Sequence, residues 1–222
     1  MSRVFLACLL LLACSALADV FGRPLTAETK PALLQSLTVL TASPLTVGEF
    51  KQVRTIKKLN REFVSTGFFA IDRQSGIVWD THKPFASVFW VGDDAMVQFD
   101  PARNTKKTVS VKENPVFAEF SKTIQSVFSG NYGELERNFK IYFEKKGDAF
   151  SVGLVPKENA VARVIASIVL EGTKELDKVK ITDGDGNPVV YEFSAHGHFQ
   201  NLESVDGAYR DIAQKFSKLK AK

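Results

Sequence analysis

The spacing between hydrophobic residues changes along the chain, and each change predicts a different element. Near the start, Leu33, Leu37 and Leu40 recur at helical spacing, so residues 26–40 are expected to form a helix that ends before Ser43 and Pro44. After residue 50 the hydrophobic positions alternate with polar ones, which is typical of strands with one buried face. This alternation predicts strands at residues 50–54, 63–73, 77–80, 85–91, 96–99, 139–144, 150–155, 164–170, 176–181 and 189–193.

Further helices are expected between and after these strands. Pro115 suits the first position of a helix, and apolar residues that share one side of that helix follow it. These residues are Val116, Phe117, Phe120, Ile124, Val127 and Phe128. The helix is expected to end at Gly130, with a short helical turn at residues 134–137, and a last helix is predicted at residues 206–219. The apolar face of that last helix consists of Tyr209, Ile212, Phe216 and Leu219.

The order of these elements predicts an α+β fold with one large antiparallel sheet. Short turns join most successive strands, and such connections favour a meander of about 10–11 strands. A sheet of this size curls, and more than about eight strands leave an interior when they curl into a barrel. Helices inserted into the strand order would then form a lid over a cup. Residues 19–222 contain no linker and no internal repeat, so a single domain is expected.

The composition adds one unusual feature, which is an excess of phenylalanine. The chain has 18 Phe against 4 Tyr and 2 Trp, so most of its aromatic surface has no hydroxyl group to satisfy. This surface suits either a large core or a pocket for an apolar ligand, and composition leaves both open. The formal charge is only +4 and is mixed along the chain, so no nucleic-acid partner is expected.

The first 18 residues have the pattern of a secretory signal peptide. Arg3 precedes an apolar run over residues 4–13, which is shorter than the roughly 20 residues that span a bilayer. The small-x-small site at residues 16–18 predicts cleavage before Asp19 and export of the mature chain. A competing interpretation treats residues 11–14 as a lipobox that would lipidate Cys14, although Leu12 occupies a position that usually holds a smaller residue.

The search for catalytic chemistry leaves no candidate. Both cysteines, Cys8 and Cys14, lie in the signal segment, and a mature chain without them has no thiol nucleophile. No paired nucleophile and base, glycine-rich phosphate loop or dinucleotide fingerprint occurs in the sequence. We therefore expect no enzymatic activity and no cofactor.

Two segments resemble metal-binding patterns without completing them. The histidines are His82, His196 and His198, of which the last two would share one face of a strand and form half of a metal site. No carboxylate follows them at a ligand spacing. Residues 183–187 contain two Asp-Gly pairs, but the EF-hand frame places Pro188 and Ser194 where Gly and Glu are required. A tight hairpin turn is the better prediction for this segment, and no metal is expected.

A series of short motifs then gives a resemblance to a known family. The motifs are Phe50-x-Gln52, Gly67-x-Phe69-x-Ile71-x-Arg73, Ile77-x-Trp79, Pro84, Val91-Gly92-Asp93, Phe99-Asp100-Pro101 and Tyr191-x-Phe193. In this order and spacing they resemble the bacterial outer-membrane lipoprotein carrier (LolA) family. Gln74 replaces the usual proline after the arginine, and a C-terminal helix replaces a further strand, so the chain looks like a divergent branch.

The resemblance implies a fold, a ligand and a set of binding residues. The fold would be an incomplete (half-open) antiparallel β-barrel with helices forming a lid over an apolar cavity. That cavity would hold acyl chains of lipoprotein or glycolipid cargo, and Arg73 would act as a latch on backbone carbonyls of the lid. The ligand-binding residues implied are Phe50, Phe69, Ile71, Arg73, Ile77, Trp79, Phe89, Phe117, Phe120 and Ile124.

The same resemblance implies a periplasmic shuttle. A monomer would take its cargo from an inner-membrane exporter to an outer-membrane acceptor. Two alternatives stay open. Lipidation of Cys14 would make the chain a membrane-anchored acceptor of the same fold, and a stable protein partner would instead indicate an envelope-stress sensor that binds stray acyl chains.

Overall fold

The computed structural model describes residues 19–92, 96–109 and 115–220, with the backbone alone for residues 39, 109, 115–120, 124 and 220. The helices are α1 (Lys30–Leu40), α2 (Pro115–Phe128), α3 (Tyr132–Asn138), α4 (Asn159–Ala162) and α5 (Arg210–Lys220). Short 3-10 helices are η1 (Val20–Gly22), η2 (Lys57–Leu59), η3 (Leu202–Ser204) and η4 (Gly207–Tyr209). Within these residues, no helix has the length and apolar character needed to cross a membrane.

All strands in the described part of the chain belong to one antiparallel sheet. They are β1 (Leu45–Ile56), β2 (Arg61–Asp72), β3 (Gly76–Lys83), β4 (Ser87–Val91), β5 (Met96–Asp100), β6 (Thr105–Val109), β7 (Phe139–Lys146), β8 (Ala149–Pro156), β9 (Ile165–Gly172), β10 (Leu176–Asp183) and β11 (Pro188–Phe199). Their spatial order is β6-β5-β4-β3-β2-β1-β11-β10-β9-β8-β7.

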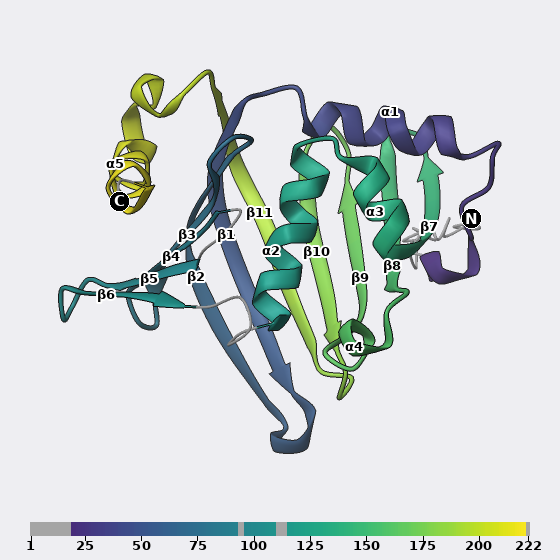
Figure 1. Ribbon diagram of the computed structural model, residues 1–222, viewed down its shortest axis with the longest axis horizontal. Helices are drawn as coiled ribbons and strands as arrows, with labels where there is room; N and C mark the ends of the chain where they lie inside the picture. Colours follow the sequence, from purple (N-terminus) through teal and green to yellow (C-terminus); the bar gives the residue numbers. More distant parts are fainter. Residues whose placement is uncertain (1–18, 93–95, 110–114, 221–222) are drawn as a thin grey trace, which may run out of the picture.

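The sheet curls without closing, because its two outermost strands, β6 and β7, lie at opposite ends of the order. The first and last strands of the chain, β1 and β11, pair at its centre (Figure 1). A register shift between Val47 and Glu49 interrupts this central pair, and such bulges increase the local twist and bend of a sheet. The expected α+β, half-open antiparallel barrel of about 10–11 strands is confirmed.

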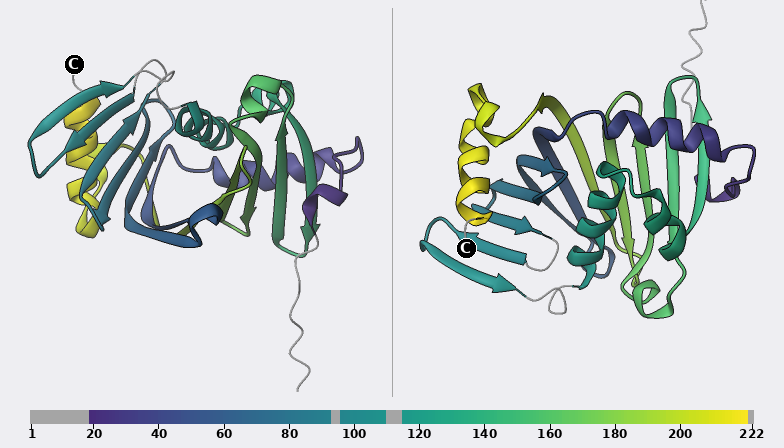
Figure 2. Two further views of the ribbon diagram at one scale, coloured as in Figure 1. Left: turned by 90° about the horizontal axis from the view of Figure 1, so that it is seen from below. Right: turned by 45° about the horizontal axis from the view of Figure 1, so that its top comes forward.

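The helices lie on both faces of the sheet, and we name the faces accordingly. The inner face is the face whose buried side chains pack with α1, α2 and α3, through residues such as Leu37, Val127 and Leu135. The outer face carries α5, with Ile212 and Phe216 packed on Val78 and Val88. Figure 2 shows α2 between the two wings of the bent sheet and α5 behind one of them.

The C-terminal helix therefore forms no part of the lid, although it has the apolar face that the sequence predicts. It begins at Arg210, and Ile212, Phe216 and Leu219 are buried against the outer face. Its Lys215 reaches the buried Asp80 on β3, with 2.6 Å between Nζ and Oδ2. Burial alone would lower the pKa of Lys215, but hydrogen bonds to Asp211 and Asp80 outweigh it and the pKa is raised.

Two local predictions have clear outcomes. The sequence missed β6, because its Lys106 and Lys107 are exposed and no hydrophobic alternation marks the strand. Lysine is a residue that protects the edge of a sheet from pairing with other chains. The predicted turn at residues 183–187 is confirmed, since Asp183 accepts hydrogen bonds from the backbone N–H groups of Asp185 and Asn187.

Candidate functional site

The inner face holds a cluster of aromatic rings at the centre of the sheet, which we call the aromatic cluster: Phe50, Phe69, Trp79, Tyr191 and Phe193. The ring of Trp79 lies 5.3 Å from the centroids of both Phe50 and Tyr191. Phe69 and Phe193 are 5.1 Å apart in an edge-to-face arrangement. Burial raises the pKa of the Tyr191 phenol, so this group stays uncharged at neutral pH.

Strand register explains why these rings meet. Phe69 pairs with Trp79 between β2 and β3, and Phe50 pairs with Phe193 between β1 and β11. Directly opposed residues of antiparallel strands point to the same face of the sheet. Side chains two residues apart along a strand point to the same face, so Ile71 lies on the face of Phe69 and its partner Ile77 on the face of Trp79. These two isoleucines extend the apolar surface next to the cluster.

Most of the expected strand residues converge on this surface. Phe50, Phe69, Ile71, Ile77 and Trp79 are buried there, and the half-buried Phe89 packs against them. Sequence reasoning quoted Tyr191 and Phe193 only as a motif and missed them as site residues. Their alternation in residues 189–193 marks one buried face, but only the pairing of β11 with β1 places that face next to Trp79.

The expected residues of the covering helix have a partial outcome. Phe117, Phe120 and Ile124 lie in α2, which begins at Pro115 as predicted, but their side chains are outside the described part of the structure. At the other end of the same helix, Val127 and Phe128 are buried in the apolar cluster of the inner face. This end of α2 therefore packs on the sheet.

Arg73 lies directly after the end of β2, and its side chain is exposed, in contrast to the buried Phe69 and Ile71 of that strand. Its guanidinium Nη1 donates a hydrogen bond to the carbonyl oxygen of Thr41 at 3.1 Å, and its backbone N–H donates to the Pro44 carbonyl. Because Thr41 directly follows α1, Arg73 ties the end of that helix to the sheet.

The two nearby histidines have separate surroundings. His198 Nε2 lies 2.8 Å from Glu175 Oε1, a carboxylate that spacing along the chain did not reveal. His196 is half-buried with its ring 5.8 Å from that of Phe69, and burial lowers its pKa although Glu175 and Asp177 act in the opposite direction. No group of three or more His, Cys, Asp or Glu side chains suited to a metal occurs within residues 19–92, 96–109 and 115–220.

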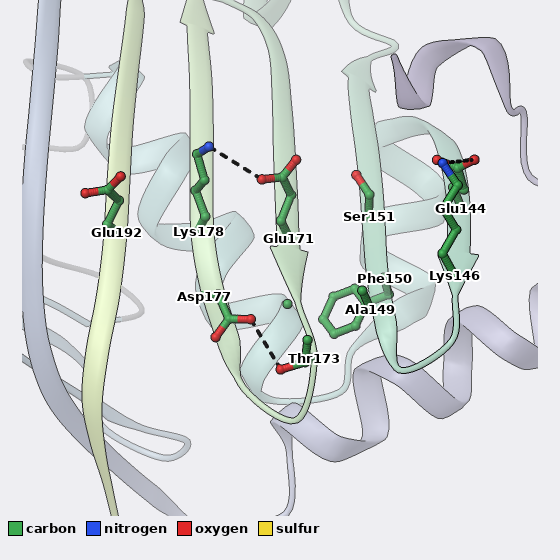
Figure 3. Close-up of a pocket in the computed structure, with 11 residues that line it drawn as sticks. Glu144, Lys146, Ala149, Phe150, Ser151, Glu171, Thr173, Asp177, Lys178 and Glu192 are labelled. Atoms are coloured by element: carbon green, nitrogen blue, oxygen red, sulfur yellow. Dashed lines mark hydrogen bonds and ion pairs between the residues drawn. The ribbon is translucent and has the colours of Figure 1, made fainter. Parts of the chain in front are cut away.

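A second concave surface lies on the outer face of β7 to β11, with a volume of about 370 Å³ (Figure 3). Charged side chains dominate its lining and pair with one another. Lys178 lies 3.7 Å from Glu171, and Lys146 lies 3.2 Å from Glu144. Because six of its eleven lining residues are charged and four of these form ion pairs with one another, we take the inner face, and not this groove, as the candidate site for an apolar ligand.

Comparison with known proteins adds a family match. A family model described as the outer membrane lipoprotein carrier protein LolA matches residues 43–204. This range begins two residues before β1 and ends after β11, so it includes every strand that contributes to the aromatic cluster. A comparison with curated protein sequences gives no match.

Several solved structures resemble the fold. An outer membrane lipoprotein-sorting protein domain from Vibrio parahaemolyticus has 11% identity and a TM-score of 0.44, covering 85% of this chain and 100% of that one. A LolA superfamily protein from Nitrosomonas europaea has 8% identity and a TM-score of 0.46, covering 77% and 93%. The MucA/MucB complex of Pseudomonas aeruginosa contains a chain with 10% identity and a TM-score of 0.46, covering 84% and 60%.

Proposed function

Because this chain belongs to the outer membrane lipoprotein carrier protein LolA family, we propose that it binds the acyl chains of lipidated cargo on its inner face. The cargo is a lipoprotein or a glycolipid. The protein carries it through the periplasm from an exporter in the inner membrane to an acceptor in the outer membrane. The family is described as a carrier, which agrees with the lack of catalytic motifs in the sequence.

The observation that supports this proposal is the continuous apolar surface of the inner face. The aromatic cluster, Ile71 and Ile77 form one hydrophobic set with residues of α1 and α2, and every member of the aromatic cluster is buried. An acyl chain needs contact with such a surface, since each buried CH₂ group contributes about 0.8 kcal/mol. Side chains of α1 and α2 now occupy this surface, so cargo binding requires these helices to move away from the sheet.

The free energy gained by burying acyl chains explains why the change of such a carrier from its closed to its open state should cost free energy. Three chains of about 16 carbons would gain on the order of 38 kcal/mol relative to water. No carrier can release that cargo into solution, so the cargo must pass directly from one apolar surface to another. A closed, empty state held by contacts such as the one between Arg73 and Thr41 offsets part of the binding energy and favours release to the acceptor.

The two tryptophans provide a direct test of where acyl chains bind. Trp79 lies in the aromatic cluster of the inner face, whereas Trp90 packs with the outer-face residues and donates its indole N–H to the Ser75 carbonyl. Each single-tryptophan variant, Trp90→Phe and Trp79→Phe, is titrated with lipopeptides that carry brominated acyl chains. Bromine quenches indole emission only on contact, so we expect strong quenching of Trp79 and little quenching of Trp90.

The outcomes of this titration distinguish acyl binding on the inner face of the sheet from binding on its outer face. Equal quenching in both variants would place the acyl chains elsewhere, and no quenching in either would contradict acyl binding. Circular dichroism verifies that Trp79→Phe, a change within a packed cluster, leaves the fold intact. Native purification from the periplasm followed by lipid extraction and mass spectrometry then identifies the cargo. Recovery of no acyl species above a control would count against the carrier function.

A further inference from the structure

A two-stranded ribbon extends beyond the rest of the sheet, and we define it as residues 55–65. The last pair between β1 and β11 is Arg54 with Val189, and the first pair between β2 and β3 is Thr66 with Lys83. Between these limits the strands β1 and β2 pair only with each other, around a turn in which Asn60 has a φ of 47°. Figure 1 shows this ribbon projecting past the lower end of α2.

The ribbon exposes large apolar side chains, whereas turns in contact with water usually carry polar ones. Leu59 at the turn is 60% exposed, and Phe63 and Val64 are 49% and 47% exposed. Consecutive strand residues point to opposite faces, so Phe63 and Val64 leave both faces of the ribbon apolar. Phe63 lies on the same side of β2 as Phe69, and therefore continues the inner face toward solvent.

The same segment and Arg54, which directly precedes it, carry a concentration of positive charge. Arg54, Lys57, Lys58 and Arg61 are all exposed, and Glu62 is the one acidic residue from position 50 to position 65. Within the described part of the chain none of these four basic side chains forms an ion pair, whereas the neighbouring Lys51 pairs with Glu192 at 3.5 Å. The backbone N–H of Lys57 donates to Asn187 Oδ1, which ties the turn of the ribbon to the β10–β11 turn.

We propose that this ribbon binds the surface of a bilayer that contains anionic lipids. Unpaired basic side chains are attracted to negatively charged headgroups, and exposed apolar side chains at the same tip insert at the boundary between headgroups and acyl chains. Neither feature alone is sufficient, but the ribbon presents both at a site free of other strands. Contact at this tip would bring the membrane to the end of the sheet where Phe63 continues the inner face.

Sedimentation with lipid vesicles tests this proposal on the full-length mature protein. Vesicles of phosphatidylcholine alone are compared with vesicles containing an equal amount of phosphatidylglycerol, and stronger binding to the anionic vesicles is expected. The double variant Lys58→Gln/Arg61→Gln should bind anionic vesicles roughly 25-fold more weakly, since each basic residue near such a surface is worth about fivefold. Leu59→Ser should weaken binding about fivefold by removing an apolar group from the interface.

Matched controls change similar residues away from the ribbon. Lys140→Gln/Lys180→Gln removes two exposed charges from β7 and β10, and Leu34→Ser removes an exposed apolar side chain from α1. These controls should bind as the unchanged protein does. Equal losses in the controls and the ribbon variants, or no preference for anionic vesicles, would overturn the proposal.

Vesicle binding and cargo binding can fail separately. Quenching of Trp79 by acyl chains measures cargo on the inner face, whereas vesicle sedimentation measures attachment of the ribbon to a bilayer. A different outcome is that the protein does not bind vesicles, while its ribbon variants lose cargo transfer between native membranes. That result would overturn the proposal, because the ribbon would then bind a protein partner and not a lipid surface.

Discussion

Individual side chains hold the lid and the sheet of this protein together through a few specific contacts. The exposed Arg73 donates one hydrogen bond from its side chain to the end of α1, and the half-buried His196 lies against Phe69 of the aromatic cluster. Neither residue is part of the apolar surface itself. Their effects should therefore appear in the balance between closed and open states and in the pH dependence of stability.

Replacement of Arg73 tests the latch. Arg73→Leu removes the hydrogen bond to Thr41 at an exposed site, so the free energy of unfolding should change by less than about 1 kcal/mol. If the closed state loses a similar amount of free energy relative to the open state, the variant should hold cargo roughly fivefold more tightly. Its transfer of cargo to an acceptor should then be slower. The transfer rate is measured between purified proteins. Arg103→Leu, which removes another exposed arginine, serves as control, and normal transfer by Arg73→Leu would count against the latch.

Acidification tests the environment of His196. Its pKa is lowered mainly by burial, so the unfolded chain binds a proton more readily than the folded one. The stability associated with the neutral ring is complete above the ordinary pKa of 6.5 and is lost as the pH falls from there toward the folded pKa. Urea midpoints at about pH 7.5 and about pH 5 should therefore differ less in His196→Gln than in the unchanged protein. The same difference in both proteins would contradict this assignment.

Whole elements differ in what they cover. The helices α1, α2 and α3 lie over the inner face, whereas α5 seals the outer face of β2, β3 and β4 with Phe216 fully buried. The ion pair between Lys215 and Asp80 adds a fixed polar contact beneath α5. The C-terminal helix therefore stabilises one wing of the sheet without occupying the inner face, where we propose that cargo binds.

A change in α5 should affect stability and leave ligand binding intact. Phe216→Ala should lower the free energy of unfolding by about 3–5 kcal/mol, because it opens a cavity between the helix and the outer face. Acyl-chain quenching of Trp79 by the folded variant should stay unchanged. Lys218→Ala, an exposed position of the same helix, should alter stability by less than about 0.5 kcal/mol. Loss of Trp79 quenching in folded Phe216→Ala would show that α5 takes part in binding.

At the scale of the whole molecule, the open sheet carries the proposed binding face, and the protruding ribbon extends from one end of that face. The central pairing of β1 with β11 brings the aromatic cluster together, and the ribbon of residues 55–65 extends from two of the strands that carry it. The proposed transport between membranes depends further on how the N-terminus is processed. A free carrier and an anchored acceptor can share every feature of this fold.

The mass of the mature N-terminus distinguishes these two proteins. The pattern of residues 16–18 predicts a chain that begins at Asp19 with an unmodified amine. Mass spectrometry of the protein recovered from the periplasmic fraction should show this start. A diacylated or triacylated Cys14 in the membrane fraction would instead establish the anchored form.

The sequence by itself determined the elements whose signals are local. Alternation at period two located ten of the eleven strands, and Pro115 with the apolar stripe after it located α2. The same alternation indicated which residues of each strand share a face, whereas the resemblance to the carrier family is what grouped Phe50, Phe69, Ile71, Ile77 and Trp79 from three strands into one apolar set. The edge strand β6 escaped because its exposed lysines leave it without a hydrophobic period.

Only the tertiary structure decided how these segments meet. The pairing of β1 with β11 adds Tyr191 and Phe193 to the site, α5 packs on the outer face instead of the lid, and Arg73 reaches Thr41. Periodicity reports which face of an element is buried, but it carries no information on the partner that buries it. That choice depends on contacts between segments far apart in the chain, which exist only once the sheet has formed.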